Sequence, residues 1–315
     1  MSEDAYAPAA RAAMAAVDET FGRDDGHRAL HAKGVFAGGT FVATPEAARL
    51  TKAAHMQGGE VPVLVRFSNG AHDAHADDRR ADAFGMATKF RPPGADATDI
   101  VAITLPAFFV RTPEDFIAFT RASKRGLGGQ PGPRFALYLA RHREAWRAVS
   151  AVLRFKPPLS YATCRFNALH AFKWVAADGT ERFVRYSWIP EAGERSLSGS
   201  EAKQRGRDYL EQEVGERLAG EPVRFTLQVQ IAAAGDPTDD ATAVWPEDRE
   251  RIDVGTLELT RLEIGREQDG EVLVFDPVNV IEGIELSDDP LPRLRSAAYS
   301  ISVDRRIGAR GAPGS

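Results

Sequence analysis

The sequence predicts an α+β protein built on an antiparallel β-barrel of about eight strands with helical insertions. Two observations predict this class. Short strand-like runs gather in two clusters that are split by helical segments, a pattern that suits an antiparallel barrel better than a regular strand–helix alternation. The chain of 315 residues is also long enough to bury a large core, and neither a rich linker nor an internal repeat divides it.

The first third of the chain holds the first cluster. Its strand-like runs, which alternate or are continuously apolar, are residues 39–43, 61–68, 86–91 and 100–104. A helix is expected over residues 45–56, with Pro45 in its first turn. A second helix is expected to begin at Thr112, because this residue can cap it and is followed by Pro113 and two acids that complement the helix dipole.

The second cluster follows a Gly/Pro-rich loop at residues 126–133. A long amphipathic helix is expected over residues 135–155, and a polar helix over residues 199–218. The strands of this cluster are expected at residues 171–176, 182–188, 222–232 and 255–264. Residues 1–25 are expected to form an N-terminal arm, residues 26–308 a single domain, and residues 309–315 a flexible tail.

The composition is typical of a water-soluble protein, with 43% hydrophobic and 27% charged residues. The net charge of −5 has both signs interspersed, so no nucleic-acid partner is expected. The single cysteine, Cys164, excludes a disulfide within the chain and a metal site built from cysteines, and packing is its expected role. No apolar run resembles a signal peptide or a membrane span, so we expect a cytoplasmic protein with no membrane partner.

The chemistry of the chain is first indicated near its end. Arg295 lies four residues before Tyr299, a helical spacing that places a guanidinium beside a phenol oxygen. A fixed positive charge there favours phenolate over phenol. Phenolate suits ferric iron, and tyrosine is one of the protein ligands of haem. The pattern Arg-x-x-x-Tyr is common, however, so other segments must supply the rest of a haem site.

A second set of motifs lies near the N-terminus. The segment Arg28-Ala-Leu-His31-Ala-Lys-Gly resembles the segment that carries the distal histidine of haem catalases. The run from Val63 to Ser68 resembles the next strand of that family, in which the residue at Arg66 pairs with a haem propionate and the one at Ser68 hydrogen-bonds the histidine. The chemistry agrees, because a neutral imidazole can take a proton from one peroxide oxygen and return it to the other.

Further segments resemble the same family, and together they cover about residues 26 to 308. The resemblance implies haem b (iron protoporphyrin IX) with Tyr299 as the axial ligand of its iron, held by Arg295 and, behind it, His170 and Asp289. Further residues are implied at the haem in separate roles. Arg28, Arg66 and Arg306 would neutralise the propionates, Phe108 would belong to the haem-binding set, and Phe116 would stack on the porphyrin.

The sequence departs from the full-length catalases at one position that bears on activity. Ile103 stands where those enzymes carry a distal asparagine that donates to the bound peroxide. Phe84 also replaces an arginine of the family, and the chain extends only to Ser315, so it resembles the short catalase-related peroxidases best. The loss of one preorganised donor can lower a rate on the order of a hundredfold, so weak catalase activity is expected.

The sequence therefore predicts a haem-dependent peroxidase that reduces hydrogen peroxide or an organic hydroperoxide with a small organic reductant. A hydroperoxide isomerase or lyase on the same fold stays open, as does a haem carrier or sensor without catalysis. Monomer and homodimer are both compatible with the sequence. The segment from His72 to Asp78 has residue types that bind divalent metals, but a solvated loop is the expected reading.

Overall fold

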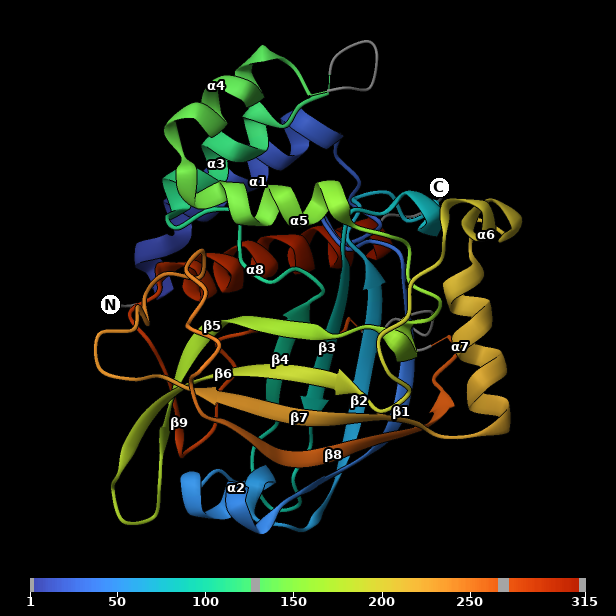
Figure 1. The fold of residues 1–315 in the computed structure, drawn as a ribbon. Coiled ribbons are helices and arrows are strands. Elements are labelled where there is room, and N and C mark those ends of the chain that lie inside the picture. The colour runs from blue at the N-terminus through green and yellow to red at the C-terminus, as the bar shows by residue number, and fades with distance from the viewer. Residues whose placement is uncertain (1–2, 126–130, 266–271, 312–315) are drawn as a thin grey trace.

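The computed structural model describes residues 3–125, 131–265 and 272–311, and its core is a closed antiparallel barrel (Figure 1). Eight strands follow one another in the order β4-β3-β2-β1-β8-β7-β6-β5, and the pairing of Ile103 with Asn167 joins β4 to β5 and closes the ring. The strands are β1 (Gly34–Ala43), β2 (Glu60–Asn69), β3 (Phe84–Phe90), β4 (Thr98–Ile103), β5 (Phe166–Val175), β6 (Glu181–Pro190), β7 (Val223–Ile231) and β8 (Arg251–Leu262). The predicted fold class is confirmed.

The barrel interior is filled by large side chains, as expected for eight strands. On β6, for example, Val184, Tyr186 and Trp188 are buried while the residues between them are only partly so. This period of two explains why the strands could be predicted from alternation. A short ninth strand, β9 (Ile284–Leu286), pairs with β5 outside the ring and was not expected.

The helices cover one end and two sides of the barrel (Figure 1). They are α1 (Ala7–Phe21), α2 (Pro45–Leu50), α3 (Pro113–Ala122), α4 (Pro133–Arg141), α5 (Trp146–Arg154), α6 (Gly199–Gln204), α7 (Tyr209–Gly220) and α8 (Pro290–Gly311). A second core, which includes Ala10, Val110 and Leu294, joins α1, α8 and the segment before α3. The expected N-terminal arm thus contains a helix that packs against α3 and α8.

Three expected helices and the expected tail differ from the structure in their boundaries. The helix expected over residues 45–56 ends at Leu50 in α2, and residues 51–53 separate it from a short 3₁₀ helix over Ala54–Met56. The helix expected over residues 135–155 is interrupted at His142, whose φ of −115° and ψ of 79° are not helical, so α4 and α5 are separate. The helix expected over residues 199–218 is interrupted between α6 and α7, where Gly206 lies. Helix α8 continues through residues 309–311 of the expected tail, while residues 312–315 and 126–130 lie outside the described residues. Within the described ranges, no helix is long and apolar enough to cross a bilayer.

Candidate active site

One outer face of the barrel collects the residues predicted on the distal side. Ser68 of β2 pairs with Gly85 of β3, and Gly85 pairs with Ile103 of β4. Residues directly opposite each other in neighbouring strands project to the same face of a sheet. Ser68 and Ile103 therefore lie on one face, and Arg66, two residues before Ser68, shares it. We call this surface the distal face.

His31 lies on the distal face in an unusual backbone conformation. Its φ of 55° is in the left-handed region, and no other described residue except glycine has a positive φ. The Arg66 Nη2 atom donates to the carbonyl oxygens of His31 and Ala32 at 2.9 and 3.0 Å, so a buried guanidinium holds this turn. The His31 Nδ1 atom lies 3.0 Å from Ser68 Oγ, which fixes the ring direction. The predicted histidine–serine pair is formed.

Gly85 makes room for this pair. A Cβ atom at Gly85 would lie 2.7 Å from Ser68 Oγ and 3.0 Å from His31 Nδ1, closer than side chains tolerate. Gly34 has a similar role beside Arg66, because its Cβ would lie 2.6 Å from Arg66 Nη2. Sequence reasoning did not assign a role to either glycine, since the clearance depends on strand register and not on local spacing.

The electrostatic surroundings keep His31 neutral. Burial first, and then the positive charges of Arg66, Arg295 and Arg28, together lower the pKa of His31 to about 3. Arg295 belongs to α8, far along the chain from His31. Its positive charge therefore acts on His31 from another part of the fold. A neutral imidazole can accept a proton, which a charged one cannot.

The proximal residues form a continuous hydrogen-bonded chain from β5 to α8. Asp289 caps α8 by accepting from the Leu291 backbone N–H at 2.9 Å, and its other oxygen lies 2.7 Å from His170 Nδ1. The opposite ring nitrogen of His170 accepts from Arg295 Nη1 at 3.1 Å. Arg295 then donates to the Tyr299 hydroxyl oxygen from Nε at 3.1 Å and from Nη2 at 2.8 Å.

Burial determines the protonation state of His170 in this hydrogen-bonded series. His170 and Asp289 are both almost fully buried. Burial lowers the pKa of His170 although Asp289 opposes the shift, so the ring is neutral with one donor and one acceptor nitrogen. The acceptor nitrogen orients Arg295, and two of its N–H groups converge on the phenol oxygen of Tyr299. Donors that converge on one oxygen are the arrangement that suits an anionic ligand.

The remaining predicted residues lie around these two groups. The ring centroid of Phe108 is 5.9 Å from that of His170, on the proximal side. Phe116 lies in the second core with its ring 6.2 Å from that of Phe109. Arg28 donates to the Leu273 carbonyl at 3.0 Å, and Arg306 is buried on α8.

These side chains fit a haem by their chemistry. A phenol oxygen that receives two guanidinium donors suits a ferric ligand, and a neutral imidazole with a hydroxyl on one nitrogen suits peroxide proton transfer. The arginines at positions 28, 66 and 306 can neutralise two propionates. The distal groups come from β2 and the segment before β1, and the proximal groups come from β5 and α8, so a cofactor held by both sets would lie between two parts of the fold.

One buried network behind His31 was missed in the sequence. Lys33 Nζ donates to Asp78 Oδ1 and to Asp208 Oδ1, both at 2.8 Å, and to the Ala76 carbonyl at 2.9 Å. Lys33 and Asp78 are buried. This network anchors the chain two residues after His31. Asp78 belongs to the segment that has metal-binding residue types, and its carboxylate is committed to Lys33. The signal that the sequence offered was a lysine two residues after the predicted catalytic histidine.

The fold and the paired groups first define a class, that of β-barrel oxidoreductases acting on peroxide. The family follows from comparison with known proteins. Residues 21–312 match the family model described as Catalase, and the chain belongs to the catalase family. Proteins of this family generally bind haem.

The relatives include short and long proteins. A protein named catalase-related peroxidase from Mycolicibacterium paratuberculosis (strain ATCC BAA-968 / K-10) is 42% identical over 302 residues, which cover 95% of this chain and 96% of that protein. A protein with the same name from Synechococcus elongatus is 31% identical, and the matched residues cover 93% of this chain and 87% of that protein. A solved bacterial catalase has a TM-score of 0.78 at 27% identity and covers 90% of this chain but only 58% of its own. The chain is thus similar to the short members over nearly their whole length.

Proposed function

We propose that the protein is a haem b-dependent peroxidase that reduces organic hydroperoxides or hydrogen peroxide with a small organic electron donor and has weak catalase activity. The observation that carries this proposal is Ile103. Its register against Gly85 puts an apolar side chain on the distal face, next to the His31–Ser68 pair. The two most similar short relatives reported above are named peroxidases, which agrees with the proposal.

Haem b, held through Tyr299, would supply the iron at which a peroxide O–O bond is cleaved. The chain's own residues prepare the proton transfers. With Nδ1–H of His31 donating to Ser68 Oγ, its Nε2 atom is left as the proton acceptor. His31 takes a proton from one peroxide oxygen at Nε2 and delivers it to the other oxygen, which leaves as water or alcohol. The low pKa of His31 keeps this base free at neutral pH.

Ile103 affects hydrogen peroxide and organic hydroperoxides differently. An isoleucine donates no hydrogen bond, so a small peroxide loses the preorganised donor that would hold it above the base. An alkyl hydroperoxide regains binding energy from apolar contact, since each buried CH₂ contributes about 0.8 kcal/mol. Disproportionation, which needs two hydrogen peroxide molecules handled in turn, suffers most. Reduction by an external organic donor is then the favoured route back to the resting enzyme.

The test is the substitution Ile103→Asn. We expect catalase turnover with hydrogen peroxide to rise at least tenfold, and the preference for an alkyl hydroperoxide to fall. Unchanged catalase turnover in a variant with normal haem content would contradict this account of Ile103. Tyr299→Phe, measured by the visible absorption of the purified protein, tests haem ligation separately, and haem of undiminished content and spectrum in that variant would refute the axial-ligand assignment.

A hydroperoxide isomerase or lyase is the second candidate, because the same apolar distal face would suit the hydrocarbon chain of a fatty acid hydroperoxide. Such an enzyme rearranges its substrate without an external reductant. Product analysis with and without an electron donor separates the two reactions. Consumption of the hydroperoxide at equal rates in both conditions, with a rearranged product, would favour the isomerase.

A further inference from the structure

Helix α5 has apolar side chains on two opposite sides, and only one of them is packed. Ala148 is fully buried against the rest of the protein. Trp146 and Leu153, seven residues apart and therefore on one face, are 57% and 81% exposed. At about 100° per residue, this exposed face points away from Ala148. A surface helix normally turns polar residues to the solvent, so an exposed tryptophan and leucine there indicate a partner.

Basic side chains flank this apolar face and lie on the neighbouring segments. Residues 133–156 contain six basic residues and one acid, Glu144, which gives a net charge of +5 in a chain whose total is −5. The six basic residues are all exposed, and none forms an ion pair with a described residue; they are Arg134, Arg141, Arg143, Arg147, Arg154 and Lys156. The remainder of the chain carries −10, since −5 minus +5 is −10. The positive charge is therefore concentrated on α4, α5 and the residues that join and follow them.

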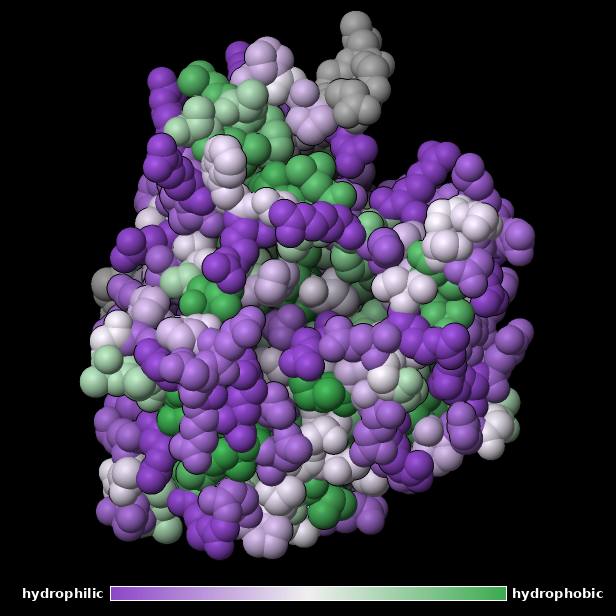
Figure 2. All heavy atoms as spheres, in the orientation of Figure 1, coloured by the Kyte–Doolittle hydropathy of each residue, from purple (hydrophilic) through white to green (hydrophobic). Residues whose placement is uncertain are grey.

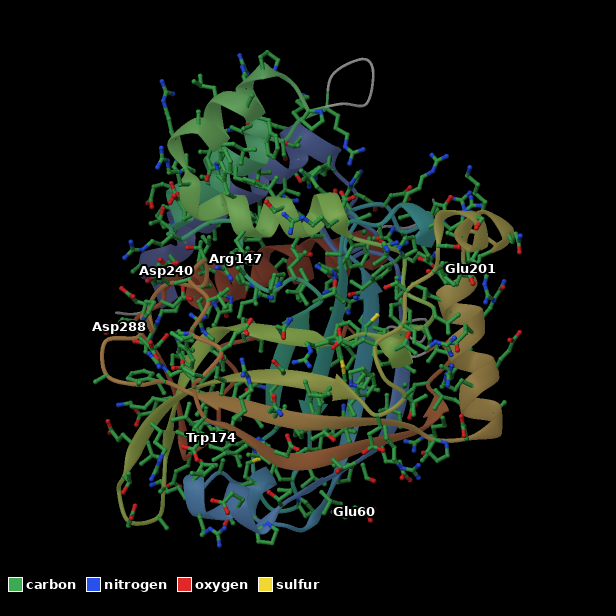
Figure 3. All side chains as sticks on the ribbon, in the orientation of Figure 1. Glu60, Arg147, Trp174, Glu201, Asp240 and Asp288 are labelled. Carbon is green, nitrogen blue, oxygen red and sulfur yellow. The ribbon has the colours of Figure 1, made fainter. Side chains whose placement is uncertain are left out.

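The apolar face is held in place and is not merely solvated. The Trp146 Nε1–H donates to the Leu139 carbonyl of α4 at 2.7 Å, so the indole is fixed while its ring remains exposed. Leu137, also on α4, is 52% exposed between Arg134 and Arg141, which lie one turn before and after it. Figure 2 shows hydrophobic residues bordered by hydrophilic ones at the top of the view, where α4 and α5 lie. Figure 3 labels Arg147, which belongs to α5.

We infer that α4 and α5 form a docking surface for an anionic lipid bilayer. The combination of an apolar stripe with tryptophan and flanking arginines is what an interfacial helix uses, because the apolar groups enter the headgroup boundary while the cations meet anionic lipids. A second copy of the chain using the same surface would bring two patches of +5 together. The inference does not depend on the proposed catalytic function, and it revises the expectation of no membrane partner to one of peripheral contact.

The tryptophans of the chain offer a specific probe. Three of the four, Trp174, Trp188 and Trp245, are at most 1% exposed, so Trp146 is the one that can report on a surface. The haem-loaded protein is mixed with vesicles of phosphatidylcholine alone or with 30–40% phosphatidylglycerol, in flotation and fluorescence measurements. We expect flotation only with the anionic vesicles, at least tenfold weaker at about 0.5 M salt. Brominated lipid should quench the Trp146 emission in the same samples.

Two variants and two controls decide the outcome. Arg147→Glu/Arg154→Glu and Leu153→Ser should each weaken binding at least fivefold, with peroxide turnover unchanged. Arg195→Glu/Arg205→Glu carries the same charge change elsewhere, and Ile264→Ser removes an 87% exposed apolar residue; both should bind normally. No flotation with anionic vesicles, or flotation without quenching by brominated lipid, overturns the inference. Selective capture of a soluble acidic protein in place of vesicles would also overturn it.

Discussion

The substitution Gly85→Ala tests how closely the distal residues are arranged. The backbone of Gly85 is not in the left-handed region, and β3 accepts any residue there on conformational grounds. The new methyl group would lie 2.7 Å from Ser68 Oγ and 3.0 Å from His31 Nδ1. An ordinary contact needs about 3.4 Å or more, so the hydroxyl must retreat by roughly 0.7 Å. The distance between His31 Nδ1 and Ser68 Oγ, which is now 3.0 Å, would then exceed hydrogen-bonding distance.

We expect Gly85→Ala to lower the reaction rate strongly and the stability of the fold only slightly. Loss of the hydrogen bond removes about 1 kcal/mol that orients the ring, and misplacement of a catalytic group by about 1 Å can cost on the order of a hundredfold in rate. We expect the rate of reaction with hydroperoxide, measured by stopped-flow absorption of the haem-loaded protein, to fall tenfold to a hundredfold. Haem content should be unchanged, because Tyr299 lies on α8.

Two variants separate this mechanism from a general loss of stability. Gly199→Ala at the first residue of α6 is the matched control, since a Cβ there meets no atom within 4 Å, and its rate should equal the wild type. In Ser68→Ala the hydrogen bond is already absent. Adding Gly85→Ala to Ser68→Ala should therefore slow the reaction far less than Gly85→Ala does alone. A Gly85→Ala enzyme of normal rate, or effects that multiply in the double variant, would refute the reasoning.

Two further predictions concern stability. Lys33→Met should lower the free energy of unfolding by about 3–5 kcal/mol, because it removes the cation paired with the buried Asp78. Lys52→Met breaks an exposed pair with Glu282 and should lower it by less than about 1 kcal/mol. Equal unfolding midpoints of the two variants in urea would contradict this difference. Burial lowers the pKa of His55 to about 3, so the unfolded chain binds the extra proton below pH 6.5 and stability is lost as the pH falls from about 6.5 towards 3. At pH 5 this loss is about 2 kcal/mol of the free energy of unfolding. The free energy of unfolding, measured in urea at pH 7.5 and at pH 5, should therefore differ by about 2 kcal/mol less in His55→Phe than in the wild type. An unaltered pH dependence in this variant would show that His55 is not its source.

The parts of the site that the sequence revealed are those built within one element. Arg295 and Tyr299 are four residues apart on α8, and helical geometry alone brings their side chains together. The distal face was recognisable only through resemblance, because His31 meets Ser68 across 37 residues and through an unusual backbone angle. The partners of Lys33 lie 45 and 175 residues away, a separation that no local pattern encodes.

The fold shows the same division between local and long-range causes. Alternating or continuously apolar runs located all eight barrel strands, but β9 has only three residues and depends on its pairing with β5. The break at His142 has no proline or glycine to announce it. There the His142 ring stacks on Tyr138 with ring centroids 4.0 Å apart, and its Nδ1 atom lies 2.7 Å from Glu144 Oε1. Helical periodicity on both sides of the break therefore predicted one long helix where the structure has two.

The rotational setting of α8 depends on the barrel. Asp289 both caps the helix and bonds His170 of β5, and Arg295 bonds the other nitrogen of the same ring. Two contacts six residues apart on the helix thus share one imidazole. A shift of the helix by one residue would turn its side chains by about 100° and break both contacts. Tyr299 lies about 15 Å along the helix from Asp289 at 1.5 Å per residue, so its direction is set at the helix start by the contact of Asp289 with β5.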